Sequence, residues 1–179
     1  MEISERMTGA ELATMRQACG LSRDDLARMA CVQTRTIKHW ESGHAGVPAD
    51  VANTVYRISM MVQDAVLTSC RDLVTARTEN VVLVRYRTDA DLHRCVPDSF
   101  GMPVGAHGAM VARMIGAMQL WPGLQDIRPR VVWFDRSAFD AWLEDEGLPD
   151  GEPALQAWAA SQVAVQAMPH RGDQPVGIM

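Results

Sequence analysis

Two helix-start signals close together place the tightest limit on how the amino terminus of this chain can fold. Thr8 to Glu11 and Ser22 to Asp25 each have the pattern of a capping box, in which a hydroxyl and a carboxylate bond first-turn N–H groups. Apolar residues follow the first box at helical spacing, and Gly20 is a helix stop. The sequence therefore predicts two short helices that are separated at Gly20.

A third short helix is predicted directly after the second. A break at residues 31–33 precedes the segment Thr34–Ser42, in which Ile37 and Trp40 lie on the buried side. Ala27 falls where the second and third helices cross, at a place that fits only a small side chain. Two short helices joined by a tight turn, the second polar and basic on its outer face, are typical of the motif that places a recognition helix in the major groove of DNA.

The segment from Leu12 to Asp50 contains the pattern M-R-x-x-x-G-L-S-x-x-x-L-A-x-x-x-x-V-x-x-x-T-I-x-x-W-E-x-G. It resembles the lambda-repressor/Cro-type (XRE) helix-turn-helix family. The resemblance implies that Arg16 and Glu41 form an ion pair tying the first helix to the third. It also implies a phosphate contact at the head of the second helix and base contacts from the third. The residues expected to bind double-stranded DNA are Arg23, Gln33, Thr34, Arg35, Thr36, Lys38 and His39.

One position departs from the family pattern. Cys31 stands at the turn, where the family usually has glycine. A left-handed backbone there costs roughly 1 kcal/mol or more in a residue other than glycine. We therefore expect either a strained turn or a variant turn that shifts the base-contacting positions by one.

A narrower resemblance extends over residues 7–120. The phrase W-E-S-G-H-A-G-V-P-A-D-V, a long helix, and V-V-L-V-R-Y-R-T-D-A-D-L look like the YdiL-like regulators and the anti-CRISPR-associated repressors of phages. This resemblance implies a small dimerising tail and repression of the chain's own operon. It rests on pattern more than identity beyond residue 50.

The remainder of the chain predicts a long helix and a small α+β body. Residues 48–77 have apolar positions in a near-heptad rhythm and form either a spine or a dimer seam. Strands are expected at 81–86 and 130–135, paired in one small sheet and each followed by a short helix. Residues 97–105 are expected to form a loop, and helices are expected at 106–120 and 152–168. The inward positions expected on the long helix are Val51, Val55, Ile58, Val62, Ala65, Ser69 and Leu73.

Charge and composition limit the class of protein. The net charge is −5, and residues 1–58 are neutral, so the excess of acid lies in the body. Such a chain does not coat nucleic acid indiscriminately, although its basic residues can converge on one face. No apolar run is long enough to span a membrane, and a cytoplasmic location is expected. The four cysteines are expected to be reduced and mostly buried.

Enzymatic and ligand-binding hypotheses find less support. Glu144 and Asp145 are adjacent on a predicted helix and so lie on different faces, which disfavours acid–base catalysis. Cys95 with His93 or His107 has no surrounding catalytic motif. We therefore predict no enzyme activity, no cofactor and no metal. A helix with Met110, Met114 and Met118 fits a core, a dimer contact or a ligand pocket.

Taken together, the sequence predicts a mostly α-helical DNA-binding repressor. Residues 7–77 form the helix-turn-helix domain with its long helix, residues 78–168 form an α+β domain for dimerisation or partner binding, and 169–179 form a flexible tail. A homodimer would bind a palindromic operator. The main competing hypothesis is an antitoxin-type regulator whose carboxyl-terminal domain binds a protein partner. An enzyme tethered to DNA by the motif and a ligand-sensing regulator are two further hypotheses.

Overall fold

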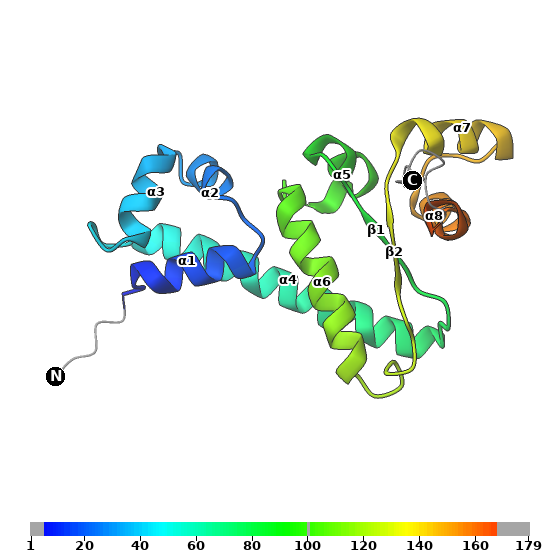
Figure 1. The fold of residues 1–179 in the computed structure, drawn as a ribbon, viewed down its shortest axis with the longest axis horizontal. Helices are drawn as coiled ribbons and strands as arrows, with labels where there is room; N and C mark the ends of the chain where they lie inside the picture. Colours follow the sequence, from blue (N-terminus) through cyan, green and yellow to red (C-terminus); the bar gives the residue numbers. More distant parts are fainter. Residues whose placement is uncertain (1–5, 100, 168–179) are drawn as a thin grey trace, which may run out of the picture. The chain divides into compact units, whose positions relative to one another are not determined.

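The computed structural model describes residues 6–99 and 101–167, which are mostly helical (Figure 1). The elements in chain order are α1 (Gly9–Ala18), α2 (Arg23–Met29), α3 (Thr34–Glu41), α4 (Ala49–Ala76), β1 (Val82–Arg85), α5 (Asp89–Cys95), the 3-10 helix η1 (Pro97–Ser99), α6 (Val104–Leu120), β2 (Arg130–Trp133), α7 (Arg136–Glu146) and α8 (Glu152–Ala167). The expected fold class is confirmed. Within the described residues no helix is long and apolar enough to cross a bilayer. The tail expected at 169–179 lies outside the described residues.

The elements form two compact units that interleave along the sequence. The first unit comprises residues 1–79 and 101–127, and the second comprises residues 80–100 and 128–179. The sequence suggested a single boundary near residue 78. The helix α6 nevertheless groups with α1–α4, because it packs along α4.

Both capping boxes at the start of the first unit are present. The Thr8 hydroxyl accepts a hydrogen bond from the Glu11 N–H (3.2 Å), and the Glu11 carboxylate accepts one from the Thr8 N–H (2.6 Å). Ser22 and Asp25 make the equivalent pair of bonds at the start of α2. Each box satisfies N–H groups that the first turn of a helix leaves without partners. The starts of α1 and α2 are therefore fixed locally by the sequence.

The three short helices and the start of α4 share one core. Leu12, Leu26 and Ile37 are completely buried there, one from each short helix. Val51 and Val55 from the first two turns of α4 belong to the same core. The long helix is therefore anchored directly to the three short helices.

The buried stripe of α4 differs in part from the expected one. Val51, Val55 and Val62 are buried as expected, whereas Ala65, Ser69 and Leu73 are only partly buried, as is Ile58. Val66 and Cys70 are buried in their place. In the carboxyl-terminal half of α4, the buried positions are thus shifted by one residue from those that the heptad pattern predicted. The helix ends at Ala76, and the next residue, Arg77, is left-handed (φ 51°).

The helix α6 docks on the short helices through a contact between two glycines. A Cβ atom on Gly105 would lie only 2.4 Å from the Gly20 carbonyl oxygen, and one on Gly20 would lie 2.3 Å from the Gly105 oxygen. Gly20 also has a positive φ of 67°. Arg113 of α6 donates a hydrogen bond to the Ala18 carbonyl at the end of α1 (2.9 Å). The contact requires both positions to lack side chains.

Two expectations about α6 and the cysteines need correction. The helix begins at Val104, earlier than the expected residue 106, because Pro103 provides a starting residue with extended backbone. Met118 is fully buried, whereas Met110 and Met114 are partly buried.

The four cysteines are free, as expected. Cys31 is exposed and Cys95 is intermediate, so only Cys19 and Cys70 are buried.

The second unit contains the expected sheet. The strands β1 and β2 are parallel, with Val84 opposite Val132, and both are shorter than the sequence suggested. The helix α8 packs against both strands. Phe134, Phe139 and Trp158 form an aromatic cluster with ring centroids 5.5–5.6 Å apart. This cluster is the core of the unit.

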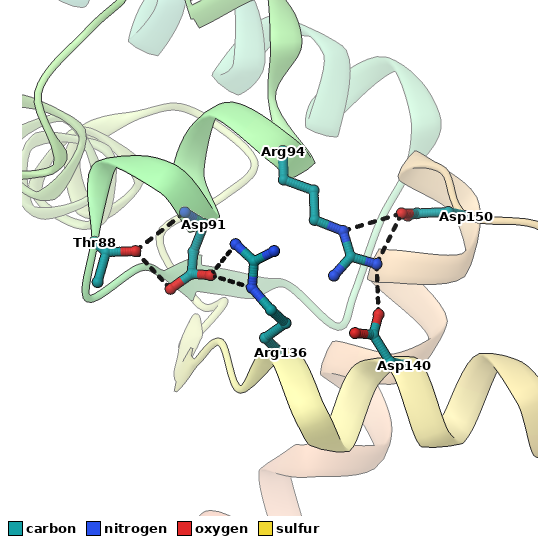
Figure 2. Close-up of polar contacts among 6 residues, drawn as sticks. All are labelled: Thr88, Asp91, Arg94, Arg136, Asp140 and Asp150. Atoms are coloured by element: carbon teal, nitrogen blue, oxygen red, sulfur yellow. Dashed lines mark hydrogen bonds and ion pairs between the residues drawn. The ribbon is translucent and has the colours of Figure 1, made fainter.

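Ion pairs join α5 to α7 and to the turn that follows α7 (Figure 2). Arg136 contacts Asp91 at 2.6 Å, and Arg94 contacts Asp140 and Asp150 at 2.5 Å and 3.1 Å. Asp140 and Asp150 belong to the acidic stretch of residues 135–152 that the sequence suggested was a solvated surface. Both side chains are 49% exposed, so they lie on a solvated surface as expected, and they also pair with Arg94 there.

The glycine contact predicts the effect of adding one methyl group to α6. Gly105→Ala should lower the free energy of unfolding by about 1–3 kcal/mol, because the new Cβ meets backbone that cannot move aside. Gly116→Ala in the same helix is the matched control: its Cβ would meet nothing within 4 Å, so helix propensity should raise stability by about 1 kcal/mol. Thermal denaturation of both variants checks this. Equal effects at the two positions would contradict the contact.

Candidate nucleic-acid interface

The carboxylate of Glu41 ties the three short helices together. It accepts hydrogen bonds from Arg16 Nε of α1 (2.5 Å) and from Arg23 Nε of α2 (2.6 Å). Arg16 also donates to the Leu21 carbonyl (2.6 Å). The Glu41 side chain is only 4% exposed. The expected pairing of Arg16 with Glu41 is therefore present, and Arg23 joins it.

The charges in this cluster are balanced in favour of an ionised Glu41. Burial alone would raise the pKa of this carboxyl group. The hydrogen bonds and positive charges of Arg16 and Arg23 outweigh burial and hold the pKa of Glu41 below its usual value. The carboxylate is thus a permanent anchor at neutral pH.

The outer face of α3 presents most of the residues that we expected to contact DNA. Gln33, Arg35, Lys38 and His39 are exposed, and Thr34 and Thr36 are partly exposed. Ile37 and Trp40 face the core, as expected. Within the described residues neither Arg35 nor Lys38 forms an ion pair, so both cations are available to an anionic partner.

Two of the expected DNA contacts also have partners within the protein. Arg23 bonds Glu41 through Nε, yet its side chain is 45% exposed and can still be reached by a phosphate. Thr34 donates its hydroxyl to a carboxylate oxygen of Asp24. This bond fixes the start of α3 against the start of α2. Thr34 is therefore better suited to positioning α3 than to contacting a base with its hydroxyl.

Sequence analysis did not identify His44, which lies beside the end of α3. Its Nδ1 is 2.6 Å from the Ser42 hydroxyl, and its ring centroid is 6.0 Å from that of His39. Both histidines are exposed. The turn at Gly43 (φ 76°) brings His44 back toward α3. The helix-turn-helix pattern ends at Gly43 and therefore does not include His44.

The sequence allowed either a strained turn or a variant turn between α2 and α3, and the structure has the strained turn. Cys31 is left-handed with φ 52°. The Val32 N–H bonds the Ala27 carbonyl at 2.9 Å, and α3 begins at Thr34 after Gln33. The turn therefore keeps its shape although a side chain occupies the left-handed position.

These features agree with a comparison against known families. Residues 12–53 match the family model described as helix-turn-helix. The match supports an XRE-type helix-turn-helix domain over this segment. No curated protein matches the chain. The helix-turn-helix domain supports a DNA-binding regulator, and α2 and α3 are the two helices joined by the short turn.

Other candidate sites are weaker. Burial raises the pKa of the Cys95 thiol to about 11, so this thiol is protonated at neutral pH and is a poor nucleophile. Its bonding partner is the Tyr86 hydroxyl rather than a histidine. Among the described residues, no group of three or more His, Cys, Asp or Glu side chains is arranged to hold a metal ion.

The Glu41 cluster predicts a large loss of stability when Arg16 is removed. Arg16→Ala should lower the free energy of unfolding by about 3 kcal/mol, because a buried carboxylate loses its buried partner. Arg28→Ala is the matched control on α2. Its ion pair with Asp25 is exposed and should be worth less than about 1 kcal/mol. Chemical denaturation compares the two, and an unchanged midpoint for Arg16→Ala would refute the structural role.

The turn predicts a stabilising substitution. Cys31→Gly should raise the free energy of unfolding by about 1 kcal/mol, because glycine adopts a positive φ without steric cost. Cys31→Ala keeps the Cβ atom and serves as the control, with no comparable gain. Thermal melts of the two variants under reducing conditions make the comparison. A loss of stability in the glycine variant would show that the turn is not strained.

Proposed function

We propose that the chain is a sequence-specific transcriptional repressor that binds a palindromic operator as a homodimer and occludes its own promoter. In this proposal α3 enters the major groove. Arg35, Lys38, His39 and Gln33 contact base edges, Thr34 and Thr36 line the interface, and Arg23 binds a phosphate. Base contacts provide specificity, and phosphate contacts set the position of the domain on the duplex. Such a regulator acts where the DNA is, in the cytoplasm.

The observation that carries this proposal is the outward face of α3. Arg35 and Lys38 are exposed there without an ion pair in the described part of the chain. An exposed cation without a carboxylate partner can form charge-assisted hydrogen bonds with a phosphate or a base edge. Here the nearest acidic anchor of the helix, Glu41, is buried and occupied by two other arginines. The resemblance to the YdiL-like and anti-CRISPR-associated repressors supports autoregulation.

A second candidate, an antitoxin-type regulator, is favoured by one feature of the second unit. Val131 and Trp133 of β2 are 43% and 41% exposed, and the guanidinium carbon of Arg87 lies 4.4 Å from the Trp133 ring centroid. Aromatic and arginine side chains together are enriched at protein interfaces. A toxin that copurifies in equal amounts and is lost on Trp133→Ser would support this candidate.

Binding to DNA from upstream of the chain's own gene tests the proposed function. Arg35→Ala should weaken specific binding by about 1–3 kcal/mol and leave the fold intact, because it removes a base contact and not a core contact. Fluorescence anisotropy at two salt concentrations, with shuffled DNA of equal length as the reference, measures both the specificity ratio and the salt dependence.

Arg87→Ala is the control for that measurement. It removes one exposed arginine from the second unit and leaves α3 unchanged. Its affinity for the upstream DNA should equal that of the parent protein. If Arg35→Ala binds as tightly as the parent, the assignment of α3 to the groove is wrong. If the parent prefers neither DNA, the proposed repressor function is wrong.

A further inference from the structure

The side of α4 that faces away from the core carries exposed apolar residues. Tyr56, Met60 and Met61 are 48%, 71% and 46% exposed. With Asn53 and Arg57 they line a shallow hollow on this face. These positions recur every three or four residues, so they form one continuous stripe along the helix. Exposed apolar residues that gather in this way mark an interaction surface more often than singly exposed ones do.

Charged residues follow the same stripe at a regular interval. Asp50, Arg57, Asp64 and Arg71 are spaced by seven residues and alternate in sign. All four side chains are exposed, and within the described residues none of them forms an ion pair. Neighbouring charges of the row lie two helical turns apart, about 10 Å, and so do not pair with each other. The row thus offers four unpaired charges in a fixed order.

In a pair of helices related by a two-fold axis, this order of charges is complementary to itself only when the helices run antiparallel. If two copies of α4 ran parallel and in register, each charge would face its own like. If they run antiparallel about a two-fold axis between Met60 and Met61, Arg57 faces Asp64 of the second copy. Asp50 then faces Arg71 of the second copy, and the two-fold axis doubles both contacts. Such flanking charges set partner choice and orientation in paired helices.

We propose that the partner of this face is a second copy of the chain, and that α4 pairs antiparallel with α4 of that copy. The apolar residues Tyr56, Met60 and Met61 pack at the centre of the seam. The four interchain ion pairs flank the seam and fix its register. This inference deepens the proposed function and rests on it for the purpose of the dimer, since a two-fold protein matches a palindromic operator.

The register of the seam gives a spacing that suits DNA. At 1.5 Å per residue, the two Ala49 residues that begin α4 lie about 34 Å apart along the helix axes. One turn of B-DNA separates half-sites by about the same length. The helix α3 directly precedes α4, and Val51 and Val55 of α4 belong to the same core as α3, so each α3 is attached near one end of the seam. The antiparallel pair of α4 helices therefore sets the distance between the two α3 helices.

Charge exchange tests the seam in a protein that contains no DNA. Sedimentation equilibrium should show a dimer for the parent chain. Arg57→Asp and Asp64→Arg should each weaken the dimer by roughly tenfold or more, because each places like charges opposite each other twice. The double variant R57D/D64R restores opposite charges and should return the dissociation constant to near that of the parent. Circular dichroism and a thermal melt verify that every variant is folded.

Three results would overturn the seam. The first is a monomeric parent chain at micromolar concentration. The second is a folded single variant that dimerises as tightly as the parent. The third is a double variant as weak as the single ones. The dimerisation measurement contains no DNA, so it is independent of the DNA-binding measurement. A chain that is monomeric but binds a DNA half-site would overturn only the seam. A dimer that binds no DNA would overturn only the proposed function.

Cysteine cross-linking tests the direction of the seam. In a Cys31→Ser background, which removes the exposed native thiol, Met60→Cys should form a disulfide-linked dimer under mild oxidation. Thr68→Cys is the matched control, since it is also exposed on α4. In the antiparallel register two such residues would be about 22 Å apart and should not cross-link. Cross-linking at both Thr68 and Met60 would indicate a parallel pair, and cross-linking at Thr68 alone would indicate another register; either result would contradict the proposal.

Discussion

The arrangement of the three short helices α1, α2 and α3 depends on the ion pairs of the buried Glu41 carboxylate. It holds Arg16 of α1 and Arg23 of α2 at 2.5 Å and 2.6 Å, and it belongs to α3 itself. Three short helices of seven to ten residues are marginal by themselves in water, so they depend on their shared core and on the bonds between them. The shared carboxylate adds directional bonds that fix α3 relative to the other two. The outward face of α3 follows from this anchor.

The ion pairs of Glu41 use two of the arginines near α3 to stabilise the fold and leave other cations available for binding. Arg16 and Arg23 are committed to Glu41, whereas Arg35 and Lys38 on the other side of α3 are not committed to any carboxylate in the described chain. A protein with a net charge of −5 has no general attraction for DNA. Its binding must therefore come from a few well-placed cations, and doubling them in a dimer raises the affinity. The proposed pairing of α4, which the exposed apolar residues Tyr56, Met60 and Met61 favour, would double these cations.

Local signals in the sequence were sufficient to predict the first unit's short helices. The capping boxes at Thr8 and Ser22 fix helix starts through neighbouring residues only, and the helices begin where they predict. The buried positions of Ile37 and Trp40 follow from helical spacing in the same way. The pairing of β1 with β2 was also predicted, because two β-branched runs in one small body have few other partners. The exposed face of α3 was thus predictable before any packing was known.

Other contacts between distant segments were not predictable. Nothing near Gly105 indicates that its backbone lies against Gly20, so the placement of α6 with the three short helices was missed. The position of His44 beside His39 depends on the turn at Gly43. In both cases the information lies in three-dimensional proximity. The alternating charges from Asp50 to Arg71, by contrast, are visible in the sequence, but their spacing acquires a meaning only once the structure shows that all four are exposed and, among the residues it describes, unpaired.

A hydroxyl-radical footprint on the DNA upstream of the chain's own gene shows whether two copies of α3 bind the two halves of one operator. We expect two protected patches on one side of the duplex, with their centres one helical turn apart, about 10 base pairs. The two patches should be related by sequence symmetry. A uniform pattern without discrete protection, or a single unpaired patch at saturating protein, would show that the chain does not bind a palindromic operator as a dimer.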